Sequence, residues 1–173
     1  MTSVAGKRCI STVLLVGLFL LVLFGMASAQ EQRPNIALKA TASKETKVLR
    51  QGKWVVEHVP VEKAVKGDTL LYAIAYTNEG RAPATDAAII DAIPSGMVYV
   101  VGSAAGKDAE ITCSIDGGKT FHKPPLKRKV RRPDGIEEDR LVPQEMYTHI
   151  RWVIHRTVQP GMGGTVFFKT TVR

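Results

Sequence analysis

The sequence predicts an all-β protein, an antiparallel β-sandwich of immunoglobulin-like type with about seven to eight strands. Almost every apolar segment after residue 34 alternates with period two, which is the pattern of a strand with one buried face. Short stretches rich in Gly, Pro, Asn and Asp separate these segments and indicate turns. No segment in this range has a convincing helical period, so two packed sheets are the natural way to bury the alternating residues.

The first 29 residues match the pattern of a secretory signal peptide, which we expect to be helical and then removed. Lys7 and Arg8 give a positive start, Val13–Phe24 is an apolar run, and Ala27-Ser28-Ala29 supplies the small residues of a cleavage site. The run is shorter than the ~20 residues that a spanning helix needs. The sequence therefore predicts an exported protein of the periplasm, the cell surface or the extracellular space. We expect the mature chain to be soluble or peripherally attached, and membrane contact through the signal peptide alone.

Cysteine content and charge limit the possible partners and cross-links. The chain has two cysteines, of which cleavage removes Cys9, so Cys113 has no partner for an internal disulfide. In AEITCSID, Ile111, Cys113 and Ile115 alternate to one side of a strand, which favours a buried thiol over an intermolecular disulfide. The formal net charge of +8 falls to +6 when cleavage removes Lys7 and Arg8, since 22 basic and 16 acidic side chains then remain. Outside the cytoplasm that charge suits polyanions such as surface polysaccharide, lipid head groups or acidic proteins.

Residues 30–59 supply two strands that join the sandwich. The apolar residues of NIALKATAS share one face: Ile36, Leu38, Ala40 and Ala42. KWVVEHVPVEK is mixed on both faces and is stopped by Pro60, as an edge strand would be.

Residues 60–173 supply the main domain. TLLYAIAYTN is apolar on both faces, which predicts a central strand. ATDAAIIDAIP and MVYVVGSA follow, and AEITCSID ends at Asp116-Gly117-Gly118, where two glycines allow the positive φ of a tight turn. THIRWVIHR and GTVFFKTTVR complete the set and place these residues inward: Ile150, Trp152, Ile154, Val166, Phe168 and Val172.

Residues 119–147 connect two strands of the sandwich, and a structureless loop of this length is uncommon in a compact domain. Pro133-Asp134-Gly135 is a turn signature. Folding about it sets Lys127–Arg132 against Ile136–Arg140, so that basic and acidic residues face each other across two strands. We therefore expect a charged β-hairpin extension.

The basic half of this hairpin is the first candidate binding site. It would be a recognition arm for a polyanionic surface polymer or an envelope protein; the alternative is a solvated edge whose charges discourage aggregation. Nucleic acid is not expected, because export removes the usual partner and no aromatic residues interleave the basic ones. Phe167, on the outward face of its strand, is an exposed aromatic that could anchor a sugar ring or a partner chain. The candidate partner-binding residues are Lys127, Arg128, Lys129, Arg131, Arg132 and Phe167.

The sequence contains no motif that requires an enzyme, a metal or a cofactor, and we expect none of the three. Gly118-Lys119-Thr120 lacks the earlier glycine of a phosphate-binding loop, because Cys113 stands in its place. His149 and His155 lie about 20 Å apart along one strand and cannot share an ion. No serine lies in a nucleophile elbow. Weaker alternatives are a ligand set gathered across strands, a thiol-dependent enzyme, and calcium held between loops by Asp68, Asp86, Asp91 or Asp116.

Several motifs in order resemble one known family. They are VKGDTLLYAIAYTNEGRAPATDAAIIDAIPSGMVYVVGSA, then CSIDGGKTF, YTHIRW and VQPGMGGTVFFKTTVR. Over residues 60–173 the chain resembles the conserved-repeat domain of secreted bacterial and archaeal surface proteins called domain of unknown function eleven. The resemblance implies an immunoglobulin-like sandwich at the cell surface or in the periplasm, and no catalytic residues. Unlike the commonest members of that family, this sequence carries a single module.

Two functional hypotheses follow. The first is an exported, non-enzymatic module that mediates protein–protein or cell-surface contacts in the bacterial envelope. The alternative is a structural subunit that polymerises into an extracellular assembly by strand exchange. In that case the extended segment Gln30–Ala42 would complete the sheet of a neighbouring copy, giving a homo-oligomer.

Overall fold

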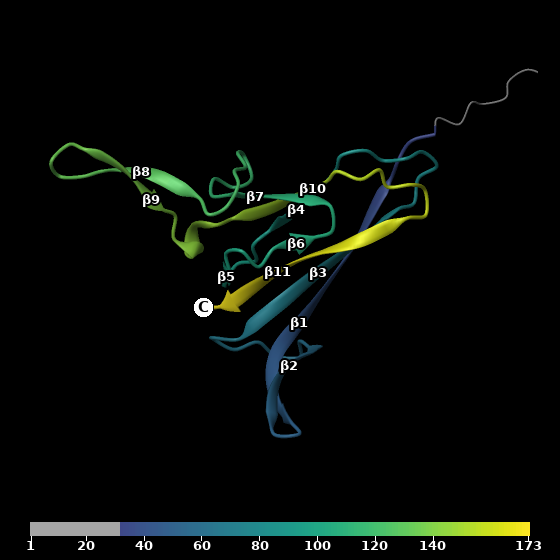
Figure 1. Ribbon diagram of the computed structural model, residues 1–173, viewed down its shortest axis with the longest axis horizontal. Helices are drawn as coiled ribbons and strands as arrows, with labels where there is room; N and C mark the ends of the chain where they lie inside the picture. The colour runs from purple at the N-terminus through teal and green to yellow at the C-terminus, as the bar shows by residue number, and fades with distance from the viewer. Residues whose placement is uncertain (1–31) are drawn as a thin grey trace, which may run out of the picture. The chain divides into compact units, whose positions relative to one another are not determined.

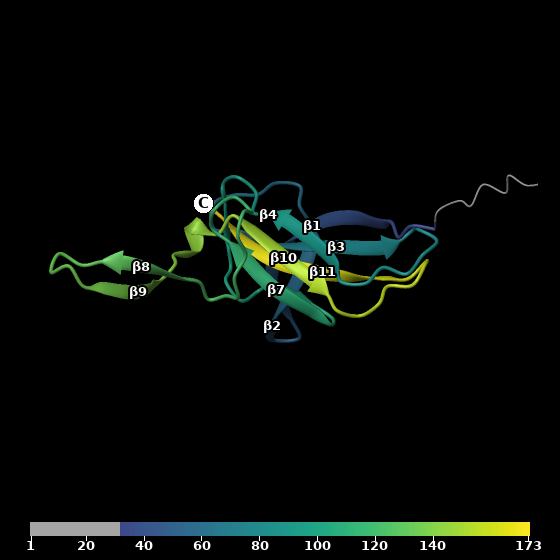
Figure 2. The same ribbon diagram turned by 90° about the horizontal axis from the view of Figure 1, so that it is seen from above.

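The computed structural model describes residues 32–173, which form two antiparallel sheets packed face to face and a separate two-stranded ribbon (Figures 1 and 2). The predicted all-β fold is confirmed; the signal helix expected over residues 1–29 lies outside the described range. The strands are β1 (Ile36–Arg50), β2 (Lys53–Pro60), β3 (Thr69–Asn78), β4 (Ala87–Ala92), β5 (Met97–Tyr99), β6 (Ala105–Gly106), β7 (Ala109–Ser114), β8 (Lys127–Arg131), β9 (Glu137–Leu141), β10 (His149–Ile154) and β11 (Gly163–Val172).

The larger sheet has the order β2-β1-β3-β11-β5, with β6 also paired to β11, and the smaller sheet has the order β4-β10-β7. β3 lies between β1 and β11, as its two apolar faces predicted. Leu70, Ile74 and Tyr76 of β3 are buried against the smaller sheet, because their alternate side chains point to one face of the strand. β2 is an edge strand that ends at Pro60, again as predicted.

The core lies where β3 and β11 face β10. Trp152 of β10 is fully buried and its ring centroid lies 5.9 Å from that of Phe168 on β11. The inward residues predicted for these two strands are buried or half-buried: Ile150, Trp152, Ile154, Val166, Phe168 and Val172. A core of large apolar side chains from both sheets supplies the main stabilisation of the sandwich.

Cys113 is fully buried on β7, opposite Ile150 of β10. Burial raises the pKa of its thiol to about 11, because the charged thiolate is poorly solvated there. The predicted core position of Cys113 is confirmed. A disulfide to another chain would first require this part of the sandwich to open.

Asn78 organises the end of the sandwich at which the described chain enters. Its side-chain oxygen accepts hydrogen bonds from the backbone N–H groups of Asn35 (3.1 Å) and Gly80 (3.0 Å). Its amide nitrogen donates to the carbonyls of Ala82 (2.8 Å) and Val158 (2.9 Å). This fully buried side chain therefore has partners for its oxygen and its nitrogen and ties the residues before β1 to two turns.

β1 is longer than predicted and only partly covered. Its first part pairs with β3, and from Glu45 onward it pairs with β2 alone. Leu38 stands opposite Tyr76 and so shares the core side of the sheet, yet 52% of its surface is exposed. The smaller sheet has three strands against six in the larger and covers only the start of β1. Of the shared face predicted for Ile36, Leu38, Ala40 and Ala42, only Ile36 is half-buried against the core, and the other three are exposed.

Residues 32–173 contain no α-helix, only the short 3-10 turn η1 (Gln144–Met146), and thus no helix long and apolar enough to cross a membrane.

Candidate interaction surfaces

The charged hairpin forms as predicted, and we call it the β8–β9 ribbon (residues 127–141). Pro133-Asp134-Gly135 makes the turn: Gly135 has φ 84°, and the backbone N–H of Arg132 donates to the carbonyl of Ile136 (2.8 Å). The register sets Lys129 opposite Asp139, and also sets Arg131 opposite Glu137. Local turn chemistry and charge order thus locate this ribbon correctly.

The basic residues of the β8–β9 ribbon differ in how far they are neutralised. Lys129 Nζ lies 3.8 Å from Glu137 Oε2, and Arg132 Nη2 lies 3.2 Å from Asp134 Oδ2. Arg131 donates to the carbonyl of Gly135 (3.2 Å). Lys127 and Arg128 are exposed, and neither has an ion-pair partner among residues 32–173. Surplus positive charge is therefore concentrated at the base of the ribbon, where Arg128 also stands opposite Arg140.

An apolar root anchors the β8–β9 ribbon. Leu126 and Val142 flank the two strands, and both are buried together with Tyr147 in the main core. The backbone N–H of Val142 donates to the carbonyl of Leu126 (2.9 Å), and the backbone N–H of Leu126 donates to the hydroxyl of Tyr147 (2.9 Å). The basic residues are thus held on a base that is part of the core.

Phe167, the sixth predicted residue, lies elsewhere. It is on β11 of the larger sheet, opposite Ala73 of β3 and Ala105 of β6, and 37% of its surface is exposed. The β8–β9 ribbon is instead rooted in the residues around η1 that precede β10. The predicted residues therefore form one basic strand and one isolated aromatic, not a single site.

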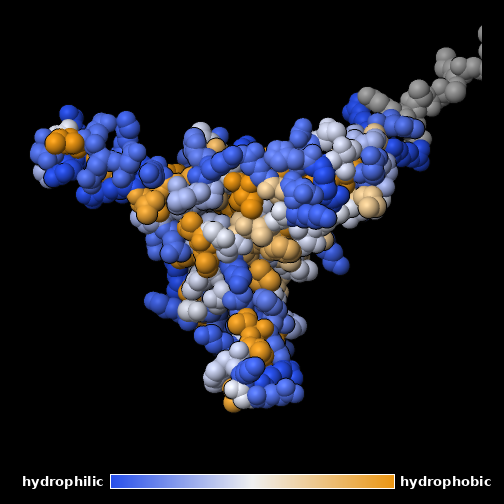
Figure 3. Space-filling view, in the orientation of Figure 1, coloured by the Kyte–Doolittle hydropathy of each residue, from blue (hydrophilic) through white to orange (hydrophobic). Residues whose placement is uncertain are grey.

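A second ribbon, the β1–β2 ribbon (residues 45–60), was not anticipated from the sequence. Gln51 and Gly52 form its two-residue turn with φ of 49° and 75°, the two positive values of a type I′ hairpin turn. Leu49 stands opposite Trp54, and both are exposed, at 59% and 71% of their surfaces. Figure 3 shows apolar side chains gathered on the projection where β1 and β2 meet.

The tip of the β1–β2 ribbon combines apolar and basic side chains. A shallow hollow there is lined by Lys47, Trp54, Val55 and Val56. The segment 47–56 contains three basic residues and no acidic one. Arg50 Nε lies 2.5 Å from Glu57 Oε1, at the beginning of the more polar part of the ribbon. The tip is therefore an exposed apolar surface with a positive rim.

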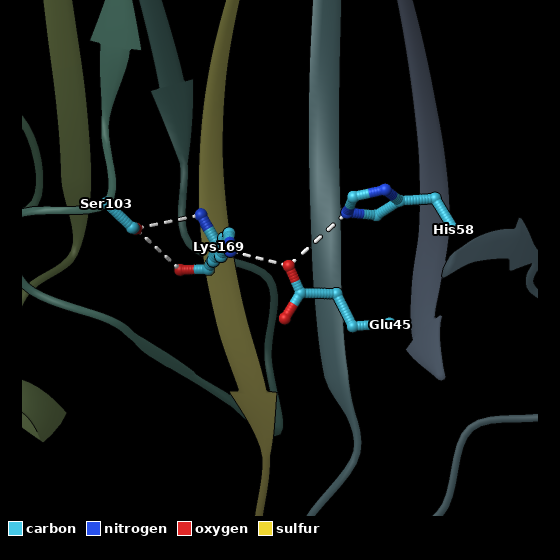
Figure 4. A network of polar contacts seen from close by, with 4 residues as sticks. All are labelled: Glu45, His58, Ser103 and Lys169. Atoms are coloured by element: carbon cyan, nitrogen blue, oxygen red, sulfur yellow. Dashed lines mark hydrogen bonds and ion pairs between the residues drawn. The ribbon is translucent and has the colours of Figure 1, made fainter. Parts of the chain in front are cut away.

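The base of the β1–β2 ribbon is held by charged groups (Figure 4). Glu45 Oε1 lies 2.5 Å from Lys169 Nζ on β11 and 3.3 Å from His58 Nε2 on β2. The hydrogen bond from Lys169 holds the pKa of the Glu45 carboxyl below its usual range, against the opposing effect of burial. Lys44 Nζ, one residue earlier, lies 2.8 Å from Asp68 Oδ2. These contacts join the ribbon to the rest of the larger sheet.

This network does not assemble a catalytic nucleophile. Ser103 Oγ accepts a hydrogen bond from the backbone N–H of Lys169 (2.9 Å) and lies 3.4 Å from its carbonyl oxygen. It is not hydrogen bonded to the side chains of Lys169, Glu45 or His58. A hydroxyl without a neighbouring base is not activated for attack, so the network fixes the position of strands.

The side chain of Asp116 closes the turn at Gly118-Lys119-Thr120. The Asp116 carboxylate accepts hydrogen bonds from the backbone N–H groups of Lys119 (3.1 Å) and Thr120 (3.0 Å) and from the Ser114 hydroxyl (2.7 Å). These bonds, that from Ser114 above all, hold the pKa of Asp116 far below its usual range. A fixed carboxylate occupies the N–H groups that a phosphate would need, in agreement with the predicted turn.

Residues 32–173 hold no group of three or more His, Cys, Asp or Glu side chains arranged to bind a metal. His155 lies instead between two carboxylates, with Nδ1 3.6 Å from Asp86 Oδ1 and Nε2 3.5 Å from Glu110 Oε2. His149, at the other end of β10, packs against Gly118. The four acids considered for calcium belong to no such group.

Comparison with family models, with curated proteins and with solved structures gave no match to this chain. The likeness to the conserved-repeat family therefore remains a prediction from the motifs quoted above.

Proposed function

We propose that this protein is an exported, non-enzymatic contact module whose β8–β9 ribbon binds an acidic protein surface or polyanionic polymer of the bacterial envelope. One observation carries the proposal: Lys127 and Arg128 are exposed, have no ion-pair partner within the described residues 32–173, and lie on a ribbon whose base is anchored in the core. Unpaired cations are free to meet a partner's anions without first breaking contacts within the chain.

The anchored root supports binding by lowering its entropic cost. Ordering a flexible segment on binding costs free energy for each side chain and backbone unit that is immobilised. Here Leu126 and Val142 already fix both strands at the point where the basic pair begins. Binding a partner therefore has to order only the outer side chains. The fixed base of the ribbon also sets the direction in which the basic pair meets the partner.

Export and the immunoglobulin-like architecture belong to the same proposal. The signal-peptide pattern of the first 29 residues supports export, and the packed antiparallel sheets support the architecture. The likeness does not extend to strand order. In immunoglobulin constant domains the last strand belongs to the smaller sheet, whereas β11 lies inside the larger sheet between β3 and β5.

Polymerisation by strand exchange has less support. Residues from Ile36 to Lys44 pair with β3 of their own chain, so these pairings would have to break before a neighbour could receive the segment. The approach just before β1 is also tight, since a Cβ at Gly80 would lie 2.4 Å from the Arg33 carbonyl oxygen. On this side of the larger sheet two edges stay open: residues 36–42 of β1, which pair with β3 but not with β2, and the outer edge of β2.

Binding of the protein to immobilised polyglutamate and dextran sulfate tests the proposal. Lys127→Glu/Arg128→Glu should lower affinity for at least one of these probes by about tenfold or more and reduce its salt dependence. This pair is chosen because neither residue has an acidic partner to lose in the part of the chain that the structure describes. The control, Lys63→Glu/Lys66→Glu, makes the same change of charge at two exposed lysines elsewhere and should retain most of the binding. Equal losses in both variants would show a response to net charge alone and contradict the proposal.

A further inference from the structure

The tip of the β1–β2 ribbon (residues 47–56) is apolar on both of its faces. Residues directly opposite in an antiparallel pair share a face. Leu49 with Trp54, and Val56 opposite Lys47, lie on one face, whereas Val48 lies with Val55 on the other. The second face also carries the pair of Arg50 and Lys53 beside the turn. Each face therefore has its own apolar pair and its own basic residues.

The presence of apolar residues on both faces favours insertion into a lipid interface over binding to a flat protein surface. A protein surface that covers one face of a two-stranded ribbon leaves the other in water, whereas the interfacial zone of a lipid bilayer surrounds an inserted tip. Trp prefers this zone, where its ring is apolar and its N–H reaches water. Lys side chains can lie along apolar surface and place their charge near lipid phosphates. We propose that residues 47–56 form a membrane-docking tip that inserts shallowly into an anionic bilayer.

The charge of the tip specifies an anionic surface. The segment has three basic residues and no acid, and Lys47 and Lys53 have no ion-pair partner among residues 32–173. Arg50 is partly neutralised by Glu57. Each lysine close to an anionic surface contributes about fivefold to partition. Anionic lipids are therefore expected to determine the affinity of docking.

The backbone limits how deeply the tip can insert. Beyond Lys44, β1 pairs with β2 alone, so each strand of the ribbon has an outer edge of backbone groups without a neighbouring strand. Such groups are costly in hydrocarbon but are satisfied by water in the head-group region. Residues 47 to 51 span ~13 Å at ~3.3 Å per residue, enough for the ~5–10 Å depth of interfacial docking.

This inference does not rest on the function proposed for the β8–β9 ribbon. It departs from the expectation that the signal peptide alone contacts the membrane, because it assigns a second, peripheral contact to the folded domain. The Glu45 network at the ribbon base would hold the tip in place relative to β11 during docking.

The test uses the chain from Gln32 onward, which is one compact unit with its own core and lacks the apolar run at Val13–Phe24. Vesicles of phosphatidylcholine, with and without phosphatidylglycerol, serve as probes. The chain has two tryptophans, Trp152 fully buried and Trp54 71% exposed, so a blue shift of emission on docking reports the tip. We expect this shift, and co-sedimentation, with the anionic vesicles.

Matched variants separate the tip from the rest of the surface. Leu49→Ser/Trp54→Ser/Val56→Ser should lower partition by more than about tenfold, with an unchanged circular dichroism spectrum. Ile136→Ser/Leu141→Ser, the control, changes exposed apolar residues of the β8–β9 ribbon and should leave partition unchanged. Trp54→Phe should keep most of the binding but lose the blue shift.

Three results would overturn the inference: no binding to anionic vesicles, full binding by the triple Ser variant, or equal binding to neutral vesicles. If the first of these results came with self-association that depends on Trp54, it would identify a second copy as the occupant of the tip. None of these results bears on polyanion binding through Lys127 and Arg128, so the two proposals fail separately.

Discussion

The two ribbons of this protein are built in opposite ways. The β8–β9 ribbon has a charged body on an apolar root, in which Leu126 and Val142 belong to the main core. The β1–β2 ribbon has an apolar tip on a charged base, in which Glu45 joins Lys169 and His58. Each ribbon therefore exposes one type of side chain, charged or apolar, and is anchored through the other type.

The difference between the two anchors predicts how each ribbon responds to salt and pH. Burial of apolar surface is insensitive to moderate changes of salt and pH, so the β8–β9 anchor should persist until the core itself unfolds. Partly exposed ion pairs weaken as salt rises or as their carboxylates are protonated. The β1–β2 anchor should therefore loosen under conditions that leave the sandwich intact.

Leu126→Ala, which tests the apolar anchor of the β8–β9 ribbon, is expected to have the largest effect on the free energy of unfolding. Removing a buried leucine side chain typically costs about 2–5 kcal/mol of the free energy of unfolding, and Leu126 is 5% exposed within the main core. Urea unfolding measures this loss. Leu141→Ala, at a leucine of the same ribbon that is 64% exposed, is the matched control and should cost less than about 0.5 kcal/mol. Equal losses would mean that the ribbon is not rooted in the core.

Glu45→Gln, which tests the charged anchor of the β1–β2 ribbon, should have a smaller effect on the free energy of unfolding, and this effect should depend on pH. Because the Lys169 hydrogen bond lowers the pKa of Glu45 in the folded state, the ionised carboxylate stabilises the fold above its unfolded pKa. That contribution is lost as pH falls through the folded pKa. The variant should lose less than about 1 kcal/mol near neutral pH, and its difference from the parent should shrink between about pH 5 and pH 3.

Urea unfolding at several pH values measures this difference, and hydrogen exchange of the amides in residues 45–50 shows whether the ribbon base loosens first. Glu62→Gln, at an exposed glutamate, is the control. A loss from Glu45→Gln that stayed constant down to pH 3 would contradict the assigned role of the carboxylate.

Lys129→Gln should have the smallest effect. Its ion pair with Glu137 spans 3.8 Å between largely exposed side chains, and such pairs contribute about 0.5 kcal/mol or less. Thermal unfolding at low and high salt should barely distinguish the variant from the parent. A loss above about 1 kcal/mol would mean that the charged body, and not only the root, stabilises the β8–β9 ribbon.

The sequence predicts one ribbon and misses the other for a physical reason. Pro133-Asp134-Gly135 specifies the turn of the β8–β9 ribbon by local chemistry, so the register of β8 and β9 follows directly. The β1–β2 turn uses Gln51-Gly52, which is not a strong turn pair. In the preceding SKETKVLR, the residues SKETK are polar on both faces, and Val48 and Leu49 put one apolar residue on each face, so the segment shows no single apolar side. Without that turn, the position of Leu49 opposite Trp54 could not be inferred.

Long-range contacts were also beyond prediction. Glu45, His58 and Lys169 belong to three strands and form no motif, so they meet only through the order β2-β1-β3-β11. Alternation correctly gave the side of β1 on which Leu38 lies, but not that the smaller sheet stops short of it. Periodicity reports which residues share a face, and the width of the opposing layer decides whether that face is buried.

The turn of the β8–β9 ribbon also makes this protein a scaffold for displaying foreign peptides. Among the described residues its two strands pair only with each other, and the buried residues that hold them lie at the opposite end of the ribbon. An insertion between Asp134 and Gly135 therefore lengthens a loop without touching the core, and each doubling of loop length costs only about 0.6 kcal/mol. An epitope or affinity tag placed there would be presented away from the sandwich.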